Sequence, residues 1–268
     1  MTLYAELYGE YRSNGELPLV FIHGFGCNAS VWTPVRSLLS SDYPVIAYDL
    51  PGHRFSIDAE GRGGAGRMAK ALLADLENRF PGGFHVAGHS MGGAVAALIA
   101  MRAPDKVRSL TLIAPGGMGP EINAGALERF ARAVNAEEIE ASLRVMVSGD
   151  FEMPRGILNA LAADRLRPGA LQAIMETYNA MFTEHSSPVK AQGVLPLELL
   201  ETLGMPVSVL WGEDDAVLPY HQMDRLPPTF RKIHLKDMGH MLLDECPVAV
   251  ADLLRETLGI PHPRVSVF

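Results

Sequence analysis

The sequence predicts an α/β protein with a mostly parallel central sheet that is flanked by helices and interrupted by a helical insertion. Short apolar runs recur along the chain, and each is followed by a turn and a stretch with helical spacing of apolar residues. This order is typical of parallel strands joined by crossover helices. An interval in the middle of the chain lacks such runs and contains helical patterns instead.

The predicted strands are short apolar runs bounded by turns. They span residues 17–22, 45–48, 84–87, 110–114, 207–211 and 232–235. The spacing of apolar residues predicts helices between these strands and one after the last of them. The helices span residues 31–39, 67–79, 91–102 and 248–258. Alternation of this kind predicts an α/β architecture.

The interval from Gly116 to about Leu203 breaks this alternation, because it contains no run typical of a strand. Four stretches have helical spacing instead, with prolines near their boundaries. They span residues 126–134, 138–146, 156–166 and 170–182. We therefore predict a core formed by residues 1–115 and 204–268, and an inserted helical cap formed by residues 116–203.

The composition is typical of a soluble globular protein, with 48% hydrophobic and 20% charged residues in a chain of 268. The net charge of −8 and the lack of a basic cluster argue against a nucleic-acid partner. No apolar run is long enough to cross a membrane, and the first ten residues do not resemble a signal peptide. We expect a cytoplasmic protein without a membrane partner, and the oligomeric state stays open.

The cysteine and histidine patterns predict neither a disulfide framework nor a metal site. Only Cys27 and Cys246 are present, and the chain has no CxxC pair and no HExxH helix. A free cysteine behaves as a small apolar residue, so we expect both thiols to be packed. No metal and no organic cofactor is predicted.

The strongest local signal for chemistry is Gly88-His89-Ser90-Met91-Gly92, at the boundary between a predicted strand and a helix. A sharp turn there holds the serine in a strained conformation that exposes its hydroxyl, and the flanking glycines let the chain segments approach closely. The bare pattern is weak evidence, but its position between strand and helix makes Ser90 the candidate nucleophile.

A serine hydroxyl needs a base within hydrogen-bonding reach, and the base benefits from an acidic partner. Asp215 follows the predicted strand that ends at residue 211, and His240 follows the last predicted strand. Because the carboxyl ends of parallel strands face one crevice, the side chains of Ser90, Asp215 and His240 are expected to converge.

Five segments together resemble the α/β-hydrolase family, which includes esterases, lactonases and carbon-carbon bond hydrolases. They are His23-Gly24-Phe25-Gly26, Asp49-Leu50-Pro51-Gly52-His53, Gly88-His89-Ser90-Met91-Gly92-Gly93, Gly212-Glu213-Asp214-Asp215 and Gly239-His240. The resemblance spans most of the predicted core and implies the α/β-hydrolase fold. One departure is Arg54, at a position where relatives commonly have glycine, and it puts the conformation of that loop in question.

The resemblance also implies roles for individual residues. Ser90 is expected to be the nucleophile and His240 the general base. The acid that orients His240 is expected to be Asp215 rather than Asp214, because relatives place it three residues after the glycine. The backbone N–H groups of Phe25 and Met91 are expected to form the oxyanion hole.

The predicted cap contains methionine and aromatic side chains that are suited to an apolar substrate pocket. The candidates for substrate binding are Met118, Tyr178, Met181 and Phe182, together with Phe25 from the core. Ordinary packing within the cap is the alternative for each of them. The stretch 110–123 is similar to the hydrolase-like part of dihydrolipoamide acetyltransferase components of acetoin dehydrogenase systems, but the chain has no room for a separate lipoyl domain.

These features predict a serine hydrolase that cleaves a carboxylic ester or related acyl bond of a small molecule through an acyl-enzyme. Four alternatives keep the same fold. They are a lactone hydrolase, a hydrolase of carbon-carbon bonds beside a ketone, an acyltransferase to an alcohol or thiol, and a non-catalytic ligand receptor. A cationic cap residue that faces Ser90 would favour an acidic ketone substrate. The sequence does not identify the substrate.

Overall fold

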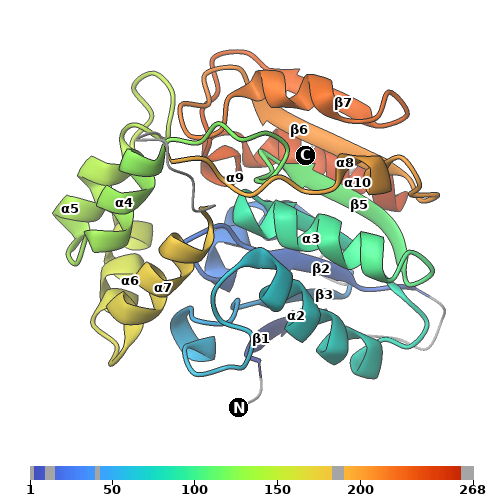
Figure 1. Ribbon diagram of the computed structural model, residues 1–268, viewed down its shortest axis with the longest axis horizontal. Helices are drawn as coiled ribbons and strands as arrows, with labels where there is room; N and C mark the ends of the chain where they lie inside the picture. The colour runs from blue at the N-terminus through green and yellow to red at the C-terminus, as the bar shows by residue number, and fades with distance from the viewer. Residues whose placement is uncertain (1–2, 10–15, 40–42, 183–189, 261–268) are drawn as a thin grey trace, which may run out of the picture.

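A seven-stranded sheet lies at the centre of the molecule, in a computed structural model that describes residues 3–9, 16–39, 43–182 and 190–260 (Figure 1). The strands are ordered β1-β3-β2-β4-β5-β6-β7, and all neighbouring pairs are parallel except β1 with β3. Their bounds are β1 Ala5–Tyr8, β2 Leu19–Ile22, β3 Val45–Tyr48, β4 Phe84–His89, β5 Val107–Ile113, β6 Val207–Gly212 and β7 Arg231–Leu235. The predicted mostly parallel α/β sheet is confirmed.

The six predicted strands correspond to β2–β7, and the prediction missed β1. This strand has only four residues, and its pattern AELY includes a glutamate. It pairs antiparallel with β3 at the edge of the sheet, where one side of a strand has no neighbour to bury it. An edge strand does not need a continuous apolar run, so the signal used for the other strands is absent from it.

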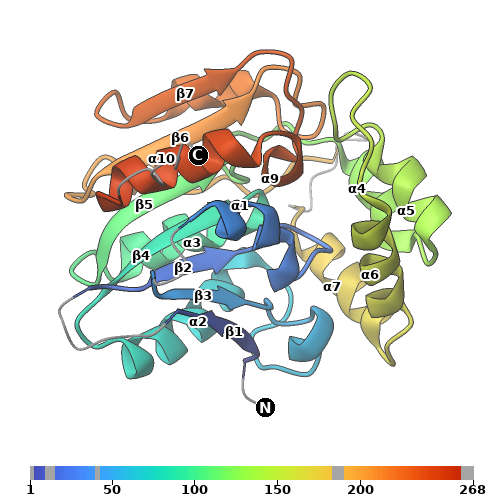
Figure 2. The same cartoon turned by 180° about the vertical axis from the view of Figure 1, so that it is seen from behind.

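Helices cover both faces of the sheet. α2 (Ala65–Arg79) and α3 (Met91–Arg102) lie on the face toward the viewer in Figure 1, and α1 (Thr33–Leu38), α9 (Leu242–Glu245) and α10 (Pro247–Leu258) lie on the face seen in Figure 2. The four helices predicted outside the cap correspond to α1, α2, α3 and α10. Both faces of the central strands are therefore buried, which explains their nearly continuous apolar sequences.

The chain between β5 and β6 contains the helical insertion. Its four main helices correspond to the four predicted ones and gather beyond one end of the sheet (Figures 1 and 2). They are α4 Ala124–Arg132, α5 Ala136–Leu143, α6 Arg155–Arg165 and α7 Ala170–Ala180, and a short α8 Leu197–Leu200 precedes β6. Buried side chains of α4, α5 and α6 belong to the same hydrophobic cluster as the sheet. The division into a core and a cap with boundaries at 116 and 203 stays a prediction.

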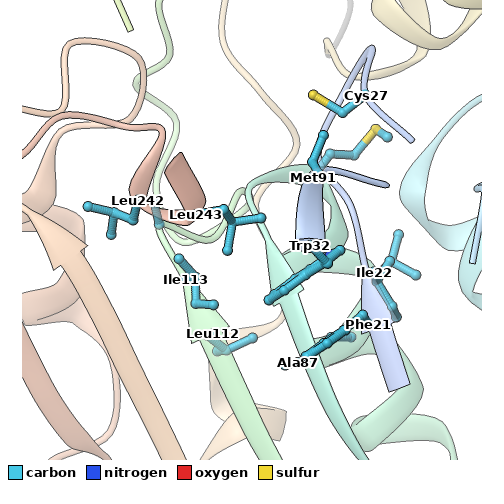
Figure 3. Packing of buried hydrophobic residues seen from close by; sticks show 14 of the residues in the cluster. Phe21, Ile22, Cys27, Trp32, Ala87, Met91, Leu112, Ile113, Leu242 and Leu243 are labelled. Carbon is cyan, nitrogen blue, oxygen red and sulfur yellow. The ribbon is translucent and has the colours of Figure 1, made fainter. Parts of the chain in front are cut away.

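Close packing of large side chains fixes the centre of this cluster (Figure 3). The ring of Phe21 in β2 stacks on that of Trp32 with their centroids 4.2 Å apart, and both side chains are fully buried. Ala87 of β4, Leu112 of β5 and Leu243 of α9 complete the region that Figure 3 shows. This packing fixes the strand ends that carry the candidate site, because close-packed interiors resist displacement.

Candidate active site

Ser90 occupies the turn between β4 and α3 in a conformation that non-glycine residues seldom adopt, with φ of 54° and ψ of −122°. Its N–H donates to the carbonyl of Ile113, and its own carbonyl accepts bonds from the N–H groups of Gly93 and Gly116. These bonds join the turn to β5 and to α3. The surrounding structure therefore holds Ser90 in a strained backbone conformation, which is common at functional sites.

Two glycines make this turn sterically feasible. A Cβ on Gly92 would lie 2.3 Å from the carbonyl oxygen of Ile22, and a Cβ on Gly88 would lie 2.2 Å from that of Gly92. Both clashes involve backbone atoms of adjacent elements, so rotation of a side chain cannot relieve them. The glycines predicted around Ser90 are therefore required by close approach of the backbone.

The structure brings Ser90, His240 and Asp215 together. The Nε2 atom of His240 lies 2.9 Å from Oγ of Ser90, and its Nδ1 atom lies 2.7 Å from Oδ2 of Asp215. All three residues are buried, with Ser90 8% exposed. A histidine that donates from Nδ1 to a carboxylate keeps Nε2 free to accept the serine proton.

Asp215 is held by four protein donors, whereas the neighbouring Asp214 is exposed. The N–H groups of Val217 and Leu218 each donate to its Oδ1 atom at 2.8 Å, and the indole of Trp211 donates to Oδ2 at 3.1 Å. The fourth bond is that of His240. This geometry agrees with the choice of Asp215 over Asp214.

The loop that carries His240 is fixed by polar contacts on both sides. Glu245 in α9 accepts three backbone N–H bonds, from Gly239 and Met241 at 2.9 Å and from Ser148 at 2.8 Å. The N–H of His240 donates to the carbonyl of Met146 at 2.7 Å. Met146 and Ser148 belong to the insertion, so the insertion is bonded directly to the histidine loop.

His89, next to the serine, completes the support of this loop. It lies 2% exposed, and its Nε2 donates to the carbonyl of His240 at 2.8 Å. Burial, together with the nearby His240, lowers the pKa of His89 to about 3. A neutral His89 with its proton on Nε2 is therefore the form that makes this bond.

The backbone N–H group of Phe25 lies in the loop after β2, and that of Met91 lies at the start of α3, next to Ser90. Within the described ranges, neither N–H donates to a protein acceptor. The loop that contains Phe25 is fixed by its neighbours: the N–H of Gly26 donates to Nε2 of His53, and Nη1 of Arg165 in α6 donates to the carbonyl of Gly26 at 3.0 Å. Burial lowers the pKa of His53 to about 4, which keeps it a neutral acceptor.

A cavity of about 210 Å³ opens beside Ser90 between the sheet and the insertion. Its walls are mostly apolar, and Ser90 and Gln192 are the polar side chains among the described lining residues, which include no charged one. The lining includes Phe25, Met91, Ala94, Leu98, Ile122, Leu127, Met181, Gln192, Val194, Leu195, Val217 and Leu218. This lining suits an uncharged apolar group.

A second, much smaller cavity of about 20 Å³ is also lined by Ser90. His240 lines this cavity, and the wall is completed by apolar side chains and by His89. The residues are Gly24, Phe25, Cys27, His89, Ser90, Leu127, Phe130, Leu143, Met146, His240 and Met241. Ser90 therefore lies where a large and a small cavity meet.

Two of the five side chains predicted to bind substrate line the larger cavity, namely Phe25 and Met181. The other three do not line it. Met118 is fully buried in the core. The ring of Tyr178 packs between those of Phe25 and Phe182, and it is 1% exposed. These three side chains pack against other protein groups, and their part in substrate binding stays a prediction.

Four of the lining residues that the prediction missed, Gln192, Gly193, Val194 and Leu195, belong to residues 190–196, which precede α8. Gln192 fixes this segment, since its Oε1 accepts from the N–H of Gly117 at 3.0 Å and its Nε2 donates to the carbonyl of Gly119 at 2.8 Å. Val194 and Leu195 then face the cavity. The sequence signal that could have indicated the segment was its position after the last cap helix.

Arg54, the departure from the family pattern, adopts a positive φ of 42°. Its Nη1 donates to Glu6 of β1 at 2.9 Å, and its guanidinium lies 3.8 Å from Asp164 of α6. The loop thus keeps a conformation that favours glycine, and ion pairs on two sides hold the arginine in it. In the part of the chain that is described, no cluster of three or more potential metal ligands occurs.

The fold and this geometry agree with a comparison against protein families, in which residues 19–253 match the Alpha/beta hydrolase family. The chain belongs to that family. A meta-cleavage product hydrolase from Pseudomonas fluorescens superposes with a TM-score of 0.80 at 19% identity, covering 96% of this chain and 94% of that one. A likeness at this identity concerns the fold alone.

Two curated relatives cover most of the chain. The dihydrolipoyllysine-residue acetyltransferase component of the acetoin cleaving system of Pseudomonas putida is 33% identical over 87% of this chain. The chain spans only 61% of the length of that relative. The pimeloyl-acyl-carrier-protein methyl ester esterase of Nitrosomonas europaea is 28% identical over 88% of this chain and 93% of its own length. No helix within the described ranges is both long and apolar enough to cross a membrane.

Proposed function

We propose that this protein is a serine hydrolase that cleaves a carboxylic ester of an apolar acid through an acyl-enzyme on Ser90. The observation that carries the proposal is the hydrogen-bonded series Ser90 Oγ, His240 Nε2, His240 Nδ1 and Asp215 Oδ2, with separations of 2.9 and 2.7 Å. Ser90, the first member of this series, lies at the wall of a cavity with apolar lining.

The proposed chemistry begins when His240 takes the proton of Ser90 and the serine oxygen attacks the ester carbonyl. Asp215 holds the imidazole in the required tautomer and stabilises its positive charge. The N–H groups of Phe25 and Met91 donate to the oxyanion, which accumulates negative charge in the transition state. His240 then donates its proton to the departing alcohol, and water repeats these steps to release the acid.

The charge of the larger cavity favours this proposal over an acidic ketone substrate. A substrate carboxylate requires a cationic partner when it is removed from water. None of the described residues that line the cavity is charged. Lys190 shortly precedes the lining residue Gln192 in the chain, but it does not line the cavity, and its ammonium group contacts the rings of Tyr178 and Phe182 instead. An uncharged acyl group therefore fits the cavity better than an acidic one.

The test combines covalent labelling with turnover. We expect a fluorophosphonate to label the protein at Ser90, and a series of methyl esters to be hydrolysed, with acid release followed by titration at constant pH. Ser90→Ala should abolish both while the thermal unfolding curve stays close to that of the unchanged protein. Ser37→Ala is the matched control, because Ser37 lies in α1 and its hydroxyl donates to the carbonyl of Pro34 in the same helix.

Two results would overturn the proposal. One is unchanged turnover of any ester by the Ser90→Ala variant. The other is a correctly folded protein that binds apolar esters without hydrolysing them and is not labelled, since this would favour a non-catalytic receptor. Transfer of the acyl group to an added alcohol or thiol in preference to water would favour the acyltransferase alternative.

A further inference from the structure

The two cavities beside Ser90 differ greatly in size and in the groups that line them. The larger has a volume of about 210 Å³ and the smaller about 20 Å³. They share Phe25, Ser90 and Leu127, so both reach the serine oxygen. His240 lines only the smaller one. In the described part of the chain, these two cavities can receive the acyl group and the alcohol of an ester bound at Ser90.

The position of His240 decides which cavity receives the alcohol. In the first half of the proposed reaction, the Ser90 Oγ–carbon bond forms, the carbon–alkoxide bond breaks, and the proton from Ser90 passes through Nε2 of His240 to the alkoxide oxygen. That oxygen must therefore leave on the side of His240, toward the smaller cavity. The acyl group then occupies the larger cavity, with the Met91 N–H beside it.

The same position must serve the second half of the reaction. Water attacks the acyl-enzyme while it donates a proton to Nε2 of His240, so it approaches along the path by which the alcohol left. A cavity needs about 10–15 Å³ to contain one water molecule. The smaller cavity, with about 20 Å³, therefore has space for water or for a group of one or two heavy atoms.

The walls of the smaller cavity are fixed by packing and by hydrogen bonds. Phe130 of α4 and Leu143 of α5 are buried, and Met146 and Met241 are at most 5% exposed. The carbonyl of Met146 accepts from the N–H of His240, so the wall and the histidine are held together. A larger alcohol would have to displace close-packed side chains, which is costly.

We propose that the alcohol side of this site admits only water and alcohols of one or two carbons. The inference rests on the proposed function. It means that the substrates are methyl or ethyl esters of acids with an apolar chain, and that the acyl-enzyme transfers its acyl group to water or to equally small alcohols. Thiol carriers and long-chain alcohols are excluded as acceptors.

The test is an alcohol series with one constant acid. Methyl, ethyl, butyl and benzyl hexanoate form the same acyl-enzyme, so kcat/KM isolates the acylation step in which the alcohol leaves. We expect kcat/KM to fall at least about tenfold between the ethyl and butyl esters, because added methylene groups have no space. Acyl transfer to competing methanol should be detected as methyl ester, and transfer to 1-butanol should not.

Variants of the wall sharpen this test. Leu143→Ala and Met146→Ala each remove side-chain atoms beside the smaller cavity, and either should raise kcat/KM for the butyl ester relative to the methyl ester. Leu98→Ala is the matched control, because Leu98 lines only the larger cavity. This control should change the preference for acyl chain length and leave the ratio between alcohols unchanged.

The outcomes separate the two proposals. A fluorophosphonate with a methoxy group releases fluoride and carries no alkoxy group above the proposed size limit, so labelling of Ser90 does not depend on space for a larger alcohol. Labelling together with equal kcat/KM values for all four esters would refute the size limit and leave the serine hydrolase in place. Absence of labelling in folded protein would refute the serine hydrolase itself.

Discussion

The Ser90 turn and the His240 loop carry neighbouring parts of the same site, but different forces fix them. The turn is held by backbone segments in direct contact, with no space for a Cβ on Gly88 or Gly92. The loop is held by side-chain and backbone hydrogen bonds, above all the three that Glu245 accepts. One part depends on excluded volume and the other on charge-assisted bonds.

This difference indicates how each part responds to substitution. Steric clashes between backbone atoms are relieved only by moving whole strands or helices. Substitutions of the glycines in the Ser90 turn should therefore affect folding. Loss of a hydrogen bond lets a loop shift slightly without unfolding the protein. Substitutions around His240 should therefore lower the proposed catalytic activity before they lower stability. The predictions below test this distinction, in order of decreasing effect.

Gly92→Ala is expected to have the largest effect. Its Cβ would lie 2.3 and 2.4 Å from the carbonyl oxygens of Ile22 and His23, so β2 and α3 would have to separate. We expect a loss of at least about 3 kcal/mol in the free energy of unfolding, measured by urea denaturation. Gly156→Ala is the control, since nothing lies within 4 Å of its Cβ and the substitution favours α6. Equal stability of the two variants would contradict the steric account.

Glu245→Ala is expected to act on turnover. Three N–H groups would lose their acceptor, and we expect kcat to fall about 10- to 100-fold because His240 is displaced from Ser90. KM should change little, since Glu245 does not line the larger cavity. The rate of fluorophosphonate labelling should fall in parallel with kcat.

Two further variants control this prediction. Glu245→Gln keeps one acceptor oxygen and should lose less activity than Glu245→Ala. Glu256→Ala removes an exposed glutamate that pairs with Arg231 and makes no contact with the His240 loop among the described residues. It should leave kcat unchanged. Full activity of Glu245→Ala would mean that Met146 and His89 position the loop without it.

Asp244→Asn is expected to have the smallest effect, and it depends on pH. The carboxylate oxygens of Asp244 have no hydrogen-bond partner in the described part of the chain, and burial raises its pKa from 3.8 to about 7. Since the folded state favours the protonated form, this group lowers stability as pH rises from about 4 through 7. Above pH 7, the ionised carboxyl lowers the free energy of unfolding by about 4 kcal/mol. The unpaired, buried amide of the Asn variant lowers it by about 2 kcal/mol instead.

We therefore expect Asp244→Asn to be more stable than the unchanged protein at pH 8, and this advantage should disappear near pH 4. Thermal unfolding at a series of pH values measures both. A stability difference that stays constant with pH would show that the carboxyl is not buried in its charged form. The contrast with Glu245, one residue away and fully bonded, makes the pair a direct test of what hydrogen bonds contribute here.

The site residues on the sheet could be predicted from the sequence because parallel strands place their carboxyl ends at one edge. Ser90 and Asp215 follow the largely buried strands β4 and β6, and His240 follows the partly buried β7, so the parallel topology brings the three together. The edge strand β1 could not be found in this way, because its AELY pattern is only partly buried. Arg54 was noted as a departure, but its partners Glu6 and Asp164 belong to distant segments.

Most of the residues by which the insertion lines the larger cavity could not be predicted from the sequence, for a physical reason. Helical spacing indicates which face of a helix is apolar, but it does not say whether that face meets the sheet, another helix or a cavity. Met118 and Tyr178 satisfy their apolar surface by packing, whereas Val194 and Leu195 reach the cavity from a segment without helical periodicity. Only the docking of the insertion decides between these outcomes.

The insertion makes two bonds whose joint consequence concerns how this protein loses function. Arg165 of α6 holds the carbonyl of Gly26, and the carbonyl of Met146 holds the N–H of His240. The insertion thus bonds to the loop of Phe25, where the proposed oxyanion hole lies, and to the loop of His240, the proposed base. Local melting of these helices would remove both bonds while the sheet remained intact, so the proposed site depends on the stability of the insertion as well as on that of the core.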